Sequence, residues 1–169
     1  MSHHNRRRTT GVLGDPGFTL IELLVVIIII AILAAIGIPI FLGSRIKAQD
    51  VAAVALVRNA LTVVESANVE YHNYAAITAA DLGGIEPAIL WIVASADLVD
   101  PSVPTVTTNV TAQARNNQVN YYGQAIDTFD VGTTSESDNR FGIQVHTTGA
   151  ASADYVKVKV IEGTSSLGW

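Results

Sequence analysis

The hydrophobic positions of the chain are concentrated in one block near its N-terminus. Residues 23–42 are 20 consecutive residues without a charge, and Arg45 and Lys47 follow shortly after them. As an α-helix, about 20 residues span roughly 30 Å, which is the thickness of a bilayer core. A run this long and uniform is unusual for the buried helix of a small protein. The pattern therefore predicts a membrane-spanning helix over residues 18–43.

A second pattern begins where this block ends. Between Arg45 and Tyr74 there is no proline or glycine, and apolar residues recur at spacings of three and four. These residues are Val54, Val57, Leu61 and Val64. The spacing places them on one face of a helix. The sequence therefore predicts that an amphipathic helix over residues 44–75 continues the membrane helix and needs another element to cover its apolar face.

The C-terminal part has the pattern of β-strands. The strand candidates are residues 103–110, 118–126, 140–148 and 154–161. The last candidate is the cleanest, because Val156, Val158 and Val160 alternate with polar residues. Turn residues at 133–139 and 149–153 favour antiparallel neighbours. We therefore expect an α+β fold, in which a four-stranded antiparallel sheet over residues 105–163 packs on the amphipathic helix.

Residues 76–104 form the expected connection between helix and sheet. Thr78 and Asp81 have the spacing of a capping box, and Pro87 suits the first turn of a further short helix. The chain is thus expected to have a leader at residues 1–17, an apolar helix at 18–43 and a globular domain at 44–169.

Composition and charge narrow the function. The chain is 49% hydrophobic and only 15% charged, which argues against a disordered protein. It has no cysteine, so disulfides and thiolate metal sites are excluded. A net charge of −5 argues against nucleic acid as a partner. Nucleotide-binding and hydrolase motifs are not found in the sequence, so we expect neither enzymatic activity nor a cofactor.

The leader and the first acid of the helix have opposite charge. Arg6, Arg7 and Arg8 outnumber the single acid of residues 1–17, which is typical of a basic leader that stays in the cytoplasm. Glu22 interrupts the apolar stretch near its start. Its carboxylate either caps the helix N-terminus at the membrane surface or requires a positively charged partner.

The order of these features resembles a known family. A basic leader ends in Gly17, the string GFTLIE follows at residues 17–22, and an apolar helix comes next. Over residues 1 to about 45, this order resembles the type IV pilins and the related pseudopilins. The resemblance implies the pilin lollipop fold, in which a long N-terminal helix packs on a C-terminal antiparallel sheet.

The resemblance also implies a maturation and assembly pathway. In that family a membrane-bound prepilin peptidase cuts after the glycine, here between Gly17 and Phe18, and methylates the new N-terminus. In a filament of parallel helices, Glu22 of one subunit would neutralise the Phe18 ammonium of a neighbour and so fix the register. The expected product is an extracellular pilus used in adhesion, twitching motility or DNA uptake. Before assembly, the precursor would be anchored in the cytoplasmic membrane by a single membrane-spanning helix. The pilus assembly platform and motor machinery would then add it to the pilus.

Several alternatives remain open on the sequence. A pseudopilin of a type II secretion system or a minor pilin would have the same leader. A conventional secretory signal cut after Gly37 would release a soluble domain beginning at Ile38, and an uncleaved anchor would keep residues 1–17. A membrane-anchored adhesin that never polymerises belongs to a different class, and it predicts that Glu22→Ala is tolerated.

Gly37 and Pro39 predict a break in the apolar helix. Proline lacks the backbone N–H and clashes with the carbonyl of Ala35, and glycine is a weak helix former. The resemblance implies that the helix is locally extended at these residues in the filament, which would allow stretch.

Residues 127–139 supply weak candidates for a calcium site, because carboxylate oxygens suit Ca²⁺. The candidates are Asp127, Asp130, Glu136 and Asp138. Their spacing does not match an EF-hand, and acidic loops are usually just solvated, so we expect no metal. Asn109 begins a three-residue glycosylation sequon, which is also a weak signal.

Overall fold

The computed structural model describes residues 17–100, 102–103, 105–148 and 152–169. Residues 1–16, and with them almost all of the predicted leader, lie outside the described residues, as does most of the predicted turn at 149–153. The chain divides into two compact units, one ending at Phe41 and one from Leu42 to Trp169. The 52-residue helix α1 (Leu20–Tyr71) contributes to both units.

In the second unit, α1 has the apolar stripe that its periodicity predicts. The buried residues of the helix are Ala53, Leu56, Val57, Ala60, Val63, Val64 and Ala67. Val57 and Val64 of the predicted stripe are fully buried. The helix ends at Tyr71, because His72 adopts a left-handed conformation with φ 52° while its N–H still donates to the carbonyl of Asn68.

The connection after α1 contains one predicted feature and lacks another. After the short 3₁₀ helix η1 (Tyr74–Ala76), α2 (Ala79–Ile85) begins at a reciprocal capping box between Thr78 and Asp81, which confirms that prediction. The short helix expected from Pro87 is wrong. The chain instead enters strand β1 (Leu90–Val93), where pairing with a neighbouring strand satisfies the backbone.

The main sheet has six strands in the order β1-β4-β5-β6-β7-β8. The remaining strands are β4 (Gln118–Gly123), β5 (Thr128–Thr134), β6 (Arg140–Thr148), β7 (Ser152–Ile161) and β8 (Thr164–Leu167). Only the β1–β4 pair is parallel, and the other four pairs are antiparallel. The α+β class with an antiparallel-rich sheet packed on the helix is therefore confirmed.

The expected number of strands was too small. Three of the four predicted strands correspond to β4, β6 and β7, whereas β1, β5 and β8 were missed. The candidate at 103–110 shrinks to β3 (Thr105–Val106). This strand pairs with β2 (Val99–Asp100) in a separate two-stranded sheet.

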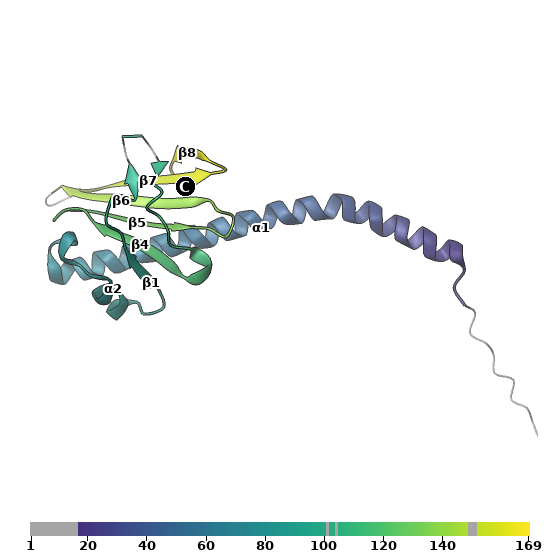
Figure 1. Cartoon of the computed structure of the whole chain (residues 1–169), viewed down its shortest axis with the longest axis horizontal. Helices are drawn as coiled ribbons and strands as arrows, with labels where there is room; N and C mark the ends of the chain where they lie inside the picture. Colours follow the sequence, from purple (N-terminus) through teal and green to yellow (C-terminus); the bar gives the residue numbers. More distant parts are fainter. Residues whose placement is uncertain (1–16, 101, 104, 149–151) are drawn as a thin grey trace, which may run out of the picture. The chain divides into compact units, whose positions relative to one another are not determined.

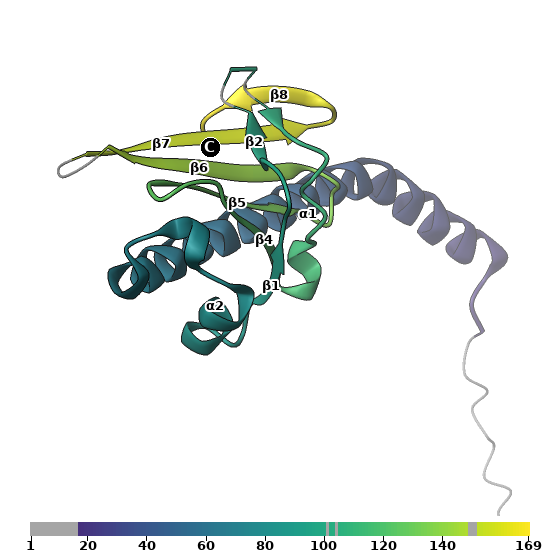
Figure 2. The same ribbon diagram turned by 60° about the vertical axis from the view of Figure 1, so that its left-hand side comes forward.

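The two faces of the six-stranded sheet are covered by different elements (Figures 1 and 2). Phe129, Val131 and Ile143 join the buried residues of α1 in one core. On the opposite face, Val158 and Val160 of β7 pack with residues of the β2–β3 region in a second core. The predicted alternation in β7 is thus present, and its valine face lies against β2 and β3 rather than against α1.

A glycine allows the close approach of β2 and β3. A Cβ atom at Gly142 would lie 2.8 Å from Cγ2 of Val99 and 3.4 Å from Cγ2 of Val106. The 2.8 Å contact would force Val99 to shift, so a side chain at this position would disturb the packing of β2 on the sheet.

Candidate assembly site

The start of α1 is closed by a capping box that involves Glu22. The Oε2 atom of Glu22 accepts hydrogen bonds from the backbone N–H and from the hydroxyl of Thr19, both at 2.8 Å. In return, the backbone N–H of Glu22 donates to the Thr19 hydroxyl at 3.3 Å. This reciprocal arrangement satisfies donors that the first turn of a helix leaves open. The capping alternative for Glu22 is therefore realised in the isolated chain.

The capping box leaves part of Glu22 free for a second interaction. Both hydrogen bonds from Thr19 end on Oε2, so Oε1 has no partner among the described residues. Phe18, four residues earlier, is 88% exposed. The Glu22 carboxylate can therefore cap its own helix through Oε2 and, through Oε1, pair with a positively charged group of another chain.

The first unit of the chain exposes its large apolar side chains. Between Leu23 and Leu42, every leucine, isoleucine, valine and phenylalanine is between 45% and 69% exposed. This helix is long and apolar enough to cross a membrane by length and composition. Since an exposed apolar surface of this extent is strongly unfavourable in water, it has to be covered by lipid or by other helices.

Gly37 and Pro39 lie within the continuous helix. The α-helical assignment runs through both residues, with Pro39 inside the helix. A Cβ atom at Gly37 would meet nothing within 4 Å among the described residues. An opening of the helix at these positions in a filament stays a prediction.

The four acidic residues proposed for calcium lie in different environments. Asp127 pairs with His146 at 3.1 Å, and Glu136 accepts a hydrogen bond from Gln49 at 2.6 Å. Asp138 is exposed in the turn after β5 and has a positive φ of 64°. Within the described ranges, His and acidic side chains form no group of three or more that could hold a metal ion.

Asp130 is in a strand, where a loop was expected. It is fully buried in β5, and its Oδ2 accepts the backbone N–H groups of Leu98 and Val99 at 2.8 and 3.2 Å. Its Oδ1 is buried without a hydrogen-bond partner among the described residues. Burial raises the pKa of this carboxyl to about 6, against the opposing effect of the two N–H donors. Asp130 therefore anchors the start of β2 on the sheet.

Asp50 of α1 is a structural residue that sequence reasoning missed. Its Oδ1 accepts the hydroxyls of Ser135 and Ser137 at 2.7 and 2.5 Å, and its Oδ2 accepts the amide of Asn139 at 2.9 Å. The β5–β6 turn is thereby fixed to the helix. The partners are 85 to 89 residues away in sequence, so no local pattern announces them.

Two further residues bear on the surface of the second unit. Asn109 is exposed, but its side-chain amide already donates to the carbonyl of Asp97 at 2.9 Å. Trp169 docks on the sheet: its ring nitrogen donates to the carbonyl of Val158 at 3.3 Å, and the Arg58 guanidinium lies 5.1 Å from its ring centre.

Comparison with known proteins agrees with the motif at the start of α1. Residues 15–38 match the prokaryotic N-terminal methylation motif. Over 64 residues the chain is 45% identical to the type IV wide pilus major component PilA4 of Thermus thermophilus. Together these matches support a type IV pilin. Pilins are structural subunits and not enzymes.

The likeness to the pilin from Thermus is partial. The matched segment covers 38% of this chain, and the chain spans about half (49%) of the length of that relative. No solved structure matches the chain.

Proposed function

We propose that the chain is the precursor of a type IV pilus subunit. In this proposal, prepilin peptidase cuts between Gly17 and Phe18, the Phe18 amine is methylated, and residues 18–43 become the helix packed in the filament core. The observation that carries the proposal is the exposed apolar helix directly after the GFTLIE string, within the segment that matches the methylation motif.

The geometry at the helix start supports an assembly role for Glu22. Cleavage would create an ammonium at Phe18, four residues before a carboxylate that has one oxygen free. Among packed apolar helices, an unpaired charge is strongly disfavoured. A Glu22 carboxylate paired with the Phe18 ammonium of a neighbouring subunit would therefore select one register of packing.

Residues 44–169 are proposed to form the surface domain of the filament. Before assembly, the subunit would reside in the cytoplasmic membrane and meet the assembly platform and its motor. The relative from Thermus is named as a major pilus component, which favours a major subunit over a minor pilin or a pseudopilin. Adhesion, twitching motility and DNA uptake are the uses proposed for such a filament.

N-terminal mass spectrometry of protein sheared from the cell surface tests the processing. We expect a chain that begins at Phe18 and is one methyl group heavier than the unmodified sequence. A chain that begins at Ile38 would instead indicate a secreted soluble domain. A chain that keeps residues 1–17 and stays in the membrane would indicate a static anchor.

Two substitutions separate the assembly role of Glu22 from its capping role. Glu22→Gln retains a side-chain oxygen for Thr19 but removes the charge, whereas Glu22→Ala removes both. If the ion pair sets the register, both variants are cleaved normally, and the amount of sheared filament falls at least about tenfold in both. Normal filaments from Glu22→Gln would assign Glu22 to capping alone and would contradict the register role.

A further inference from the structure

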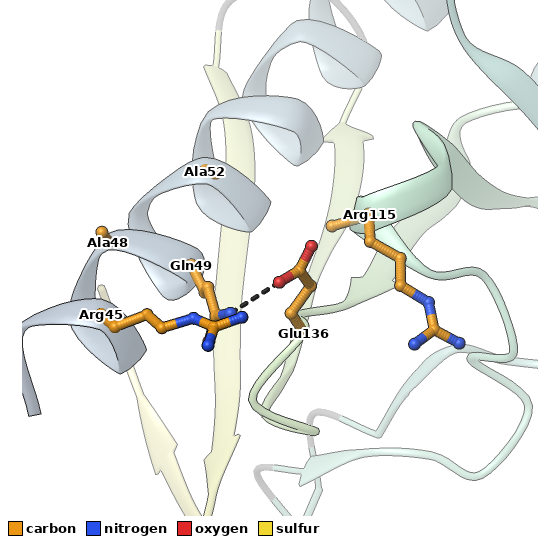
Figure 3. Close-up of a pocket in the computed structure, with 7 residues that line it drawn as sticks. Arg45, Ala48, Gln49, Ala52, Arg115 and Glu136 are labelled. Atoms are coloured by element: carbon orange, nitrogen blue, oxygen red, sulfur yellow. Dashed lines mark hydrogen bonds between the residues drawn. The ribbon is translucent and has the colours of Figure 1, made fainter. Parts of the chain in front are cut away.

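A pocket of about 360 Å³ lies at the beginning of the second unit. Arg45 and Gln49 of α1 line one side of it. Arg115 of the 3₁₀ helix η2 (Ala114–Asn116) lies opposite, and Glu136 of the β5–β6 turn lies between them (Figure 3). The other residues that line the pocket are alanines, whose side chains are small. The pocket thus combines two cations and one anion with room for a small polar group.

The charges of this pocket are not satisfied by each other. Neither the Arg45 nor the Arg115 guanidinium forms an ion pair with a carboxylate in the part of the chain that the structure describes. Glu136 accepts one hydrogen bond, from Gln49 to Oε2, and its Oε1 is open. All three charged residues are exposed, so a ligand can reach them from solvent.

The sequence places Arg45, at one side of this pocket, next to the membrane surface. Arg45 is the third residue after the uncharged run 23–42, which corresponds to a rise of about 4.5 Å along a helix. The headgroup layer outside the hydrocarbon core is roughly 5–7 Å deep on each side. When residues 23–42 span the bilayer, Arg45 therefore lies at the depth of the lipid phosphates.

We propose that this pocket binds a phospholipid headgroup that carries both a phosphate and a primary ammonium. Arg45 and Arg115 would hold the phosphate, because guanidinium forks match phosphate oxygens. The free oxygen of Glu136 would accept a hydrogen bond from the ammonium. A purely anionic headgroup fits less well, since the Glu136 carboxylate would repel it. The inference rests on the membrane-resident subunit of the proposed function.

Titration of the full chain in detergent micelles with soluble short-chain lipids tests the proposal. The probes are dihexanoyl phosphatidylethanolamine, the matching phosphatidylcholine and phosphatidylglycerol, and inorganic phosphate. The readout is the NMR shift of the Gln49 side-chain amide and the Ala114 backbone amide. We expect saturable binding of the ethanolamine lipid, with affinity at least about fivefold above that of each other probe.

Three variants assign the roles of the side chains. Arg115→Gln is expected to weaken binding of the ethanolamine lipid about tenfold. Glu136→Gln is expected to remove the preference for ethanolamine over choline. Lys159→Gln makes the same charge change outside the pocket and is expected to leave both affinities unchanged. Circular dichroism checks that each variant is folded.

Several outcomes would overturn the proposal. Equal binding of all three lipids, or equal losses in Arg115→Gln and Lys159→Gln, would indicate unspecific attraction to charge. Inorganic phosphate binding as tightly as the ethanolamine lipid would indicate a site for free anions. Failure of the proposed function would appear separately, as missing cleavage or missing filaments, because the titration uses neither step.

Discussion

Asp130 shows how one buried side chain ties two layers of the molecule together. Its carboxyl lies on β5 and accepts two backbone N–H groups at the start of β2, while its second oxygen has no partner among the described residues. Burial of a carboxylate is unfavourable unless hydrogen bonds compensate for the lost water. The pKa of about 6 indicates that the compensation is incomplete.

This pKa makes stability depend on pH. Because the folded pKa is raised from 3.8, the unfolded chain releases this proton at lower pH than the folded chain does. The contribution of Asp130 to the free energy of unfolding therefore falls as pH rises from about 4 to about 6. The expected size of the fall is about 1–3 kcal/mol, since one pKa unit corresponds to about 1.4 kcal/mol.

The substitution Asp130→Asn tests this pH dependence, because the asparagine side chain does not titrate. As pH rises from 4 to 7, the free energy of unfolding of the variant is expected to increase by about 1–3 kcal/mol relative to that of the natural chain. The measurement is urea unfolding of the full chain in nonionic micelles, followed by tryptophan fluorescence. Asp154→Asn is the control, because it removes an exposed acid of β7 that does not act on Asp130, and it should show no such improvement. A constant difference between Asp130→Asn and the natural chain over this range would contradict the assignment.

At the scale of elements, the β5–β6 turn is held to α1 mainly through Asp50. Three side chains of the turn donate to Asp50 of α1, and hydrogen bonds to a charged group are each worth about 1.5–3 kcal/mol. Since the three bonds act as a unit, we expect Asp50→Ala to lower the free energy of unfolding by about 2–4 kcal/mol.

Amide hydrogen exchange gives the local readout for Asp50→Ala. Exchange at residues 135–139 is expected to accelerate at least about tenfold, while exchange in the centre of β6 rises only with the global loss of stability. Gln49→Ala is the matched control, because it removes one exposed hydrogen bond to the same turn and should cost less than about 1 kcal/mol. Unchanged exchange at 135–139 would show that the turn holds its shape without Asp50.

The elements that the sequence predicted are those whose signal is local. The helix stripe around Val57 and Val64 and the alternation in β7 depend only on spacing along the chain. Strand β5 lies in a segment whose acidic residues suggest a solvated loop, yet its polar residues Asp130 and Thr133 are fully buried. Their hydrogen-bond partners, such as the carbonyl of Gln118 for Thr133, are brought together only by the fold.

In the candidate assembly site, too, the features that depend on neighbouring residues could be predicted, and those made by distant segments could not. Gly17, Phe18 and Glu22 lie within one string of six residues, so the sequence predicts their roles, and those roles await the experiments above. The capping box of Glu22 needs a partner only three residues away. The pocket at Arg45 could not be predicted, because Arg115 and Glu136 come from segments 70 or more residues further along the chain.

At the scale of the whole molecule, charge opposes the assembly that the apolar helix favours. Without residues 1–17, the chain has 7 basic and 14 acidic residues, a net charge of −7. Copies packed in a filament would therefore repel each other through their acidic surfaces. In 0.1 M salt, exposed charges more than about 10 Å apart are largely screened from each other, whereas charge pairs inside an apolar bundle are screened much less.

The sign of the salt effect on filaments follows from this difference. We expect the temperature at which sheared filaments dissociate to rise by several degrees as NaCl increases from 10 to about 300 mM, because repulsion is screened while the Phe18–Glu22 pairs persist. The subunit in micelles is the control, and its unfolding temperature should shift less because it lacks the neighbouring copies. A fall in the dissociation temperature would mean that exposed ion pairs, and not the apolar helices with their buried pairs, hold the filament together.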